Sequence, residues 1–233
     1  MNPELVTLLL TAITISCLHT VTGPDHYVPF IALSKSRNWN VYKTIGWTVV
    51  CGIGHVGSSI VLGLIGIYFG WQLSKLTGIE EVRGGLAAWA LFIFGCLYLL
   101  YGIIQAIRNR AHKHFDVTAG GDIYVYKHQH GTAVAPRNRV KVTPWIMFII
   151  FVLGPCEPLI PLLMFPAATH APMNIVLLIG VFLFFTLVVM VGMVLLGYFG
   201  FSLLQKSALE KYMHVIGGAS ITICGLGMLA FGW

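Results

Sequence analysis

Charged residues are scarce in this chain, because Asp, Glu, Lys and Arg make up only 9% of its 233 residues, whereas ordinary soluble domains contain about 25%. Apolar residues account for 57% of the sequence, and the mean hydropathy is +0.84. Too few charged side chains are present to cover the surface of a soluble globule of this size. The composition therefore excludes a soluble enzyme and a nucleic-acid-binding domain, and it predicts an all-α protein that crosses a membrane several times.

Cysteine is also sparse, with five residues, an odd number, and no CxxC pair. This pattern excludes a disulfide framework, and a lone cysteine in an apolar stretch is most often a small packing residue. The N-terminal sequence MNPELVTLLL has no basic stretch before its apolar run. We interpret it as the start of a membrane helix and not as a cleaved signal peptide.

Six apolar segments reach the length of about 20 residues that a helix needs to cross a bilayer. They are 5–33, 42–70, 84–107, 143–168, 173–203 and 210–232, joined by connectors at 34–41, 71–83, 108–142, 169–172 and 204–209. The organisation we expect is a first three-helix unit at 1–107, a polar loop at 108–142 and a second three-helix unit at 143–233. Twelve of the fourteen Lys and Arg residues flank the connectors 34–41, 108–142 and 204–209. The positive-inside rule then predicts a protein of the cell (inner) membrane with the long loop in the cytoplasm and both termini outside.

The two halves resemble each other at an offset of about 131 residues. Gly23-Pro24-Asp25-His26 matches Gly154-Pro155-Cys156-Glu157, and three further matches follow in the same order, Ile45-Gly46 with Ile179-Gly180, Tyr68-Phe69-Gly70-Trp71 with Tyr198-Phe199-Gly200-Phe201, and Gly84-Gly85 with Gly217-Gly218. Since each half holds three spans, the second half must insert upside down, which predicts a 3+3 inverted-topology repeat of the kind found in transporters. Prolines also predict breaks in the first and fourth helices, namely Pro24 and Pro29 in one and Pro155, Pro158 and Pro161 in the other.

Ionisable side chains within these spans are the candidates for function. Of eight acidic residues we expect only Asp25 and Glu157 deep in spans, where an ionisable group costs about 2.5 kcal/mol or more and marks a functional site by default. His26 adjoins Asp25, and His19 lies two helical turns earlier, so both imidazoles face the same way. With His55 in the second span and Cys156 beside Glu157, the candidate metal ligands are His19, Asp25, His26, His55, Cys156 and Glu157.

Imidazole and carboxylate ligands together suit divalent first-row metals such as Ni, Co, Zn and Fe(II). We therefore expect a metal ion as the transported substrate, no enzymatic activity and no organic cofactor. A lone intramembrane histidine is more often a hydrogen-bonded packing residue, and Cys156 has the same alternative as a small packing residue.

The long polar loop contains two HxH pairs, His112 with His114 and His128 with His130. Such tracts bind metal in some proteins, and a solvated basic loop is the alternative. If they bind metal, a cytoplasmic metal chaperone is an expected partner at 108–142. The sequence FDVTAGGDIYVYKH alternates around Gly120-Gly121, which favours a small hairpin.

The motif LHTVTGPDHYVPF in the first span resembles the HxxxxDH signature of the nickel–cobalt transporter (NiCoT) superfamily, in particular its UreH-like (NicO) branch. GHVGSS in the second span resembles the second signature of that superfamily. Five residues separate His19 from Asp25, where the family usually has four. The resemblance implies movement of a divalent metal across the membrane, with the motif residues of these two spans as ligands.

VLGPCEPLIPLL in the second half resembles the Pro-Cys-x-Pro motifs of CcdA-type thiol–disulfide conduits and of sulfite-exporter-like proteins. Those conduits need one cysteine in each half, and Asp25 stands at the position that matches Cys156. Two alternatives to metal transport stay open: a thiol redox protein that uses Cys156, and an exporter of a small solute or anion held at half-helix N-termini. The expected partners are the lipid bilayer and the metal ion, without nucleic acid, and a homo-oligomer is compatible with the sequence.

Overall fold

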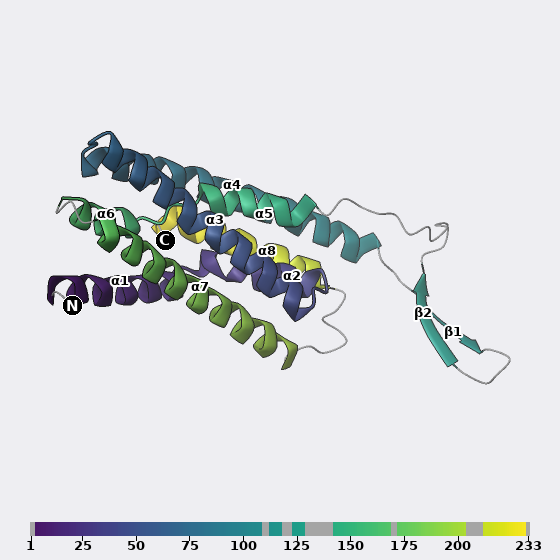
Figure 1. Cartoon of the computed structure of the whole chain (residues 1–233). Helices are drawn as coiled ribbons and strands as arrows, with labels where there is room; N and C mark the ends of the chain where they lie inside the picture. The colour runs from purple at the N-terminus through teal and green to yellow at the C-terminus, as the bar shows by residue number, and fades with distance from the viewer. Residues whose placement is uncertain are drawn as a thin grey trace.

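The computed structural model describes residues 3–108, 112–117, 123–128, 142–168, 172–203 and 212–231 (Figure 1). Helices dominate these residues. In chain order the elements are α1 (Pro3–Thr22), the short 3-10 helix η1 (Pro24–His26), α2 (Val28–Ser36), α3 (Val41–Tyr68), α4 (Leu73–Arg108), β1 (His112–Val117), β2 (Ile123–His128), α5 (Val142–Leu153), α6 (Leu159–Ala168), α7 (Pro172–Leu203) and α8 (Met213–Phe231).

Five of the described helices, α1, α3, α4, α7 and α8, are long and apolar enough to cross a membrane. The surface of the bundle agrees with a lipid surrounding, because large apolar side chains such as Leu10, Leu97 and Leu196 are exposed. Polar side chains such as Ser16, Thr48 and Thr186 are buried between the helices instead. This distribution is the reverse of that in a soluble globule, and it confirms a helical protein with several membrane-spanning segments.

Two of the predicted spans consist of two helices each, separated where the sequence places proline and glycine. The segment 5–33 is divided into α1 and α2 by residues 23–27, and the segment 143–168 is divided into α5 and α6 by residues 154–158. The three predicted spans 42–70, 173–203 and 210–232 each correspond to one uninterrupted helix, α3, α7 and α8. Pro24, Pro155 and Pro158 therefore mark the breaks as predicted, whereas Pro29 and Pro161 do not interrupt a helix, because they lie in the first turns of α2 and α6.

The prediction of a connector at 71–83 is wrong, because α4 already begins at Leu73. Glu80 is consequently inside the bundle with 1% of its surface exposed, and Asp25 and Glu157 are not the only acidic residues there. The physical reason is a salt bridge between Glu80 and Arg83, one turn apart on the same helix. Pairing the two charges allows a helix to bury a carboxylate that the sequence alone assigns to a polar connector.

The helices run along one common direction (Figure 1). The N-terminus, the C-terminal end of α8, the start of α4 and α6 lie at one end of the bundle, whereas α2, the end of α7 and the start of α8 lie toward the other. Helices α4 and α8 approach closely through glycines, since a Cβ on Gly95 would lie 2.5 Å from the Thr222 amide nitrogen and one on Gly225 would lie 2.5 Å from the Phe92 amide nitrogen. Small residues at such crossings permit tight packing of membrane helices.

The two strands form an antiparallel hairpin in which His112 is the register partner of His128 and Val117 that of Ile123. The hairpin spans the stretch for which the alternating sequence predicts one. The intervening Gly120 and Gly121 and the neighbouring His130 lie outside the described residues.

Candidate metal-binding site

The first helix break determines where Asp25 and His26 lie. The Gly23 amide donates the last bond of α1 to the His19 carbonyl, at 3.0 Å, and Pro24 has no amide hydrogen with which to continue the helix. The chain then makes a single 3-10 turn, in which the His26 amide donates to the Gly23 carbonyl at 3.1 Å. Asp25 and His26 therefore project from a turn inside the bundle and not from the face of a regular helix.

Three imidazoles meet beside this turn. His26 lies between the other two, with its ring centroid 4.8 Å from that of His19 and 4.9 Å from that of His55. One nitrogen of each ring can be chosen such that all three lie within 4.8 Å of one another. His26 and His55 are buried, and His19 is half-buried. The structure thus brings together histidines from α1, η1 and α3 in one cluster.

The hydrogen-bond partners of the rings determine which nitrogens carry protons. His26 Nδ1 lies 3.0 Å from the Gly23 carbonyl and 3.2 Å from Asp25 Oδ1, and both oxygens can only accept, so Nδ1 donates. His55 Nδ1 likewise faces the Phe151 carbonyl at 3.4 Å. In the neutral rings the Nε2 atoms then carry lone pairs, which is the form in which histidine binds a metal.

The two Nε2 atoms of His26 and His55 face each other at 3.3 Å. Two lone pairs at this distance repel each other unless a proton or a cation lies between the nitrogens. Two nitrogens that bind one ion at about 2.0–2.1 Å with a tetrahedral angle are about 3.3–3.4 Å apart. The separation of these two nitrogens therefore matches that of two ligands of a single transition-metal ion.

His19 contributes an unsatisfied nitrogen to the same cluster. Its Nε2 atom is buried and has no hydrogen-bond partner among the described residues. A buried polar atom without a partner costs about 1–3 kcal/mol, and such groups are retained where they have a use. Coordination of a cation would satisfy this nitrogen.

Both helix breaks line one cavity of about 290 Å³. Its lining residues are His19, Thr22, Gly23, Asp25, His26, Pro155, Glu157, Pro158 and Met228. Asp25 and Glu157, which are far apart in the sequence, therefore share a cavity, as the sequence predicts. Two carboxylates beside imidazole rings give this cavity a preference for cations.

The second break also reaches the imidazole cluster directly. A Cβ on Gly154 would lie 3.2 Å from His55 Nδ1, so the end of α5 is in close contact with the ring. Since Phe151 accepts the bond from the same nitrogen, α5 orients His55 while η1 orients His26. The two halves of the chain thus each hold one imidazole of the facing pair.

Two candidate ligands are absent from the cavity lining: His55, which belongs to the imidazole cluster, and Cys156, which lies apart from both the cluster and the cavity. The Cys156 side chain is fully buried in an apolar cluster with Val56, Leu159 and Phe182. Its amide donates to Ser59 Oγ at 3.0 Å. All five cysteines are free, so the described residues contain no disulfide.

Three residues of the site and its surroundings were not predicted from the sequence. Met228, near the end of α8, lines the cavity, and nothing in its apolar sequence context distinguishes it from a packing residue. Glu80 and Arg83 lie behind the second break, where Arg83 donates to the Val152 carbonyl at 2.8 Å. Their spacing of three residues, with opposite charges on one helical face, is the signal that could have indicated them.

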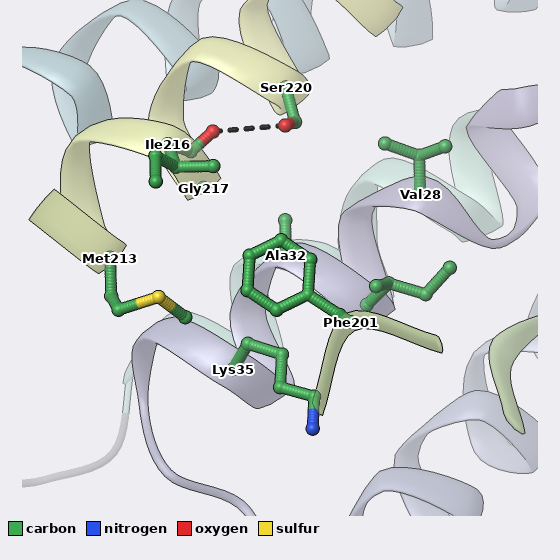
Figure 2. Close-up of a pocket in the computed structure, with 9 residues that line it drawn as sticks. Val28, Ala32, Lys35, Phe201, Met213, Ile216, Gly217 and Ser220 are labelled. Atoms are coloured by element: carbon green, nitrogen blue, oxygen red, sulfur yellow. Dashed lines mark hydrogen bonds between the residues drawn. The ribbon is translucent and has the colours of Figure 1, made fainter. Parts of the chain in front are cut away.

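A separate pocket of about 100 Å³ lies between α2 and α8 (Figure 2). Its lining is mainly apolar, with Val28, Met213 and Ile216 among the residues drawn. The ammonium group of Lys35 lies 3.6 Å from the ring centroid of Tyr198. Because neither a carboxylate nor an imidazole lines this pocket, it is unsuited to bind a metal ion.

Comparisons of the chain with protein-family models, with curated proteins and with solved structures found no match.

Proposed function

We propose that this protein transports a divalent transition-metal cation, such as Ni²⁺ or Co²⁺, through the cavity between its two helix breaks. Zn²⁺ and Fe²⁺ fit the same ligand types. The observation that carries the proposal is a cavity that His19, His26, Asp25 and Glu157 line, with His55 completing the imidazole cluster beside His26. A cavity with this lining attracts a cation, and the imidazoles favour a transition metal over Mg²⁺ or Ca²⁺.

The acidic residues have different roles in this proposal. Asp25 accepts from His26 Nδ1, which orients the ring and raises the basicity of its other nitrogen, as carboxylates beside metal-bound histidines do. Glu157 is exposed at the cavity wall and comes from the opposite half of the chain. It attracts the ion into the cavity and supplies an oxygen ligand. Together the residues provide nitrogen and oxygen ligands without the Cys156 thiolate.

Six crossings complete the proposed architecture, with α1 to α2 forming the first and α5 to α6 the fourth. The proposal retains the 3+3 inverted repeat, the cytoplasmic position of 108–142 and the external termini. Its support is the occurrence of a break in each half and the meeting of both breaks at one cavity. Transporters built in this way rock one half against the other around a fixed central site. Membership of the nickel–cobalt transporter superfamily is part of the proposal and rests on the two sequence motifs.

The test is metal flux into proteoliposomes that contain the purified protein. We expect His26→Ala and His55→Ala to abolish Ni²⁺ and Co²⁺ flux, and Asp25→Asn to reduce it strongly. His214→Ala is the matched control, since this imidazole bonds to Tyr98 outside the cavity. Unchanged flux in both His26→Ala and Asp25→Asn would overturn the proposal.

A further inference from the structure

Helix α4 carries a salt bridge that lies directly behind the second helix break. Arg83 Nη1 donates to Glu80 Oε1, and this glutamate is almost completely buried. Arg83 Nη2 donates to the Val152 carbonyl at 2.8 Å and approaches the Gly154 carbonyl at 3.4 Å. These carbonyls belong to the end of α5, where the break removes the helical donors that would otherwise bond them. Arg83 therefore caps the C-terminal end of α5 from a neighbouring helix.

Two serines connect the same salt bridge to α3. Arg83 Nη2 also donates to Ser58 Oγ at 2.6 Å, and Ser58 Oγ donates to the carbonyl of His55 at 2.8 Å. Ser59 Oγ donates to Glu80 Oε2 at 3.3 Å and accepts from the Cys156 amide at 3.0 Å. The hydrogen-bond chain thus runs from the backbone of His55, through Glu80 and Arg83, to the residue that precedes Glu157.

We propose that Arg83 is a positioning residue that fixes the second helix break, and with it Glu157, relative to His55. This inference rests on the proposed function, because it concerns the placement of Glu157 at the cavity relative to His55 in the adjoining imidazole cluster. The guanidinium group suits the task, since its planar fork reaches several acceptors at once with a fixed geometry. Lysine offers a single flexible point charge and cannot reproduce the fixed directions of the guanidinium hydrogen bonds.

A simpler role for the salt bridge is to neutralise its own two charges inside the bundle. Removal of one partner leaves a buried charge unpaired and destabilises the fold, so single substitutions to neutral residues do not separate the two roles. The double variant Glu80→Gln with Arg83→Gln removes both charges together. If neutralisation is the only role, this variant binds metal like the wild type. If Arg83 positions the break, the variant folds and binds weakly.

The experiment measures Co²⁺ affinity and amide hydrogen exchange in the purified full-length protein. We expect the double variant and Arg83→Lys each to lose affinity by about 10- to 100-fold, the range observed when groups that orient metal ligands are removed. Exchange should accelerate in the peptide that contains the Cys156 amide. Tyr98→Phe is the matched control, because it removes a hydroxyl on the same helix that hydrogen-bonds to Ser36, Arg37 and His214. This variant should change neither the Co²⁺ affinity nor the hydrogen exchange of the Cys156 peptide.

Wild-type affinity and unchanged exchange in Arg83→Lys and in the double variant would overturn the positioning role. Accelerated exchange with wild-type affinity would overturn it as well, since the break would then move without consequence for the ion. A wild-type protein that binds no divalent metal would overturn the proposed function instead. In that case the exchange of the Cys156 amide alone decides whether Arg83 holds the break in place.

Discussion

Substitution of Gly23 by alanine is expected to displace His26 and weaken metal binding without disturbing the backbone. Gly23 has φ −90° and ψ 94°, a conformation that alanine adopts readily. Its Cβ, however, would lie 2.6 Å from His26 Nδ1 and 2.8 Å from Asp25 Oδ1. An ordinary contact requires about 3.4 Å. The ring must therefore retreat by about 0.8 Å, which exceeds the tolerance of about 0.5 Å within which ligand positions have to be held.

We expect Gly23→Ala to lower Co²⁺ affinity by about 10- to 100-fold, in line with the loss of groups that orient metal ligands. Affinity is measured by titration of the purified protein, with the visible absorption of bound Co²⁺ as a second signal of altered geometry. Gly192→Ala on α7 is the matched control, because its Cβ would meet nothing within 4 Å. Equal affinities for Gly23→Ala, Gly192→Ala and the wild type would refute the view that the first break holds His26 as a ligand.

Four further predictions test other parts of the structure. His19→Leu should leave the thermal stability of the metal-free protein equal or higher, because it removes an unsatisfied buried nitrogen, yet it should weaken Co²⁺ binding; a clear loss of stability would contradict this. Cys156→Ala should keep Co²⁺ affinity close to that of the wild type, since the thiol is outside the cavity lining, and a large loss would restore it as a ligand. Gly95→Leu should lower the free energy of unfolding by about 1–3 kcal/mol or more, because the new side chain overpacks against α8. Gly192→Leu should have little effect on the free energy of unfolding. Equal denaturation midpoints for the two variants would argue against the close crossing of α4 and α8. In a protein whose native cysteines are replaced, Ala119→Cys should react with a membrane-impermeant thiol reagent only after the cells are opened, and labelling of intact cells would reverse the proposed orientation.

The main features of the helical framework follow from local chemistry. Proline and glycine at 23–24 and 154–155 interrupt their helices in any environment, because they remove donors and favour non-helical backbone. The spacing of seven residues between His19 and His26 also predicts their proximity, although the break lies between them. His55 joins the cluster from another helix. The sequence indicated it through its depth within an apolar span and through the GHVGSS motif, but not its contact with His26.

The network around Arg83 could not be predicted in the same way. Four charged residues between positions 75 and 83 look like a solvated connector, and hydropathy alone favours that interpretation. Only the tertiary structure shows that the carbonyls freed at the second break lie opposite Arg83 and give its guanidinium group acceptors. A polar segment next to a membrane span is therefore ambiguous until the partners of its charges are known.

The two breaks share a Gly-Pro sequence but not a division of tasks. Position by position, Asp25 corresponds to Cys156 and His26 to Glu157. In the first break the residue after proline is the carboxylate at the cavity and the next one is the buried imidazole. In the second break the residue after proline is the buried thiol and the next one is the exposed carboxylate. The first break thus holds its imidazole from within its own turn, whereas the second is held from outside by α3 and α4. In the transport cycle that we propose, one half moves against the other, and the self-contained first break can keep the ion while the contacts of the second break change.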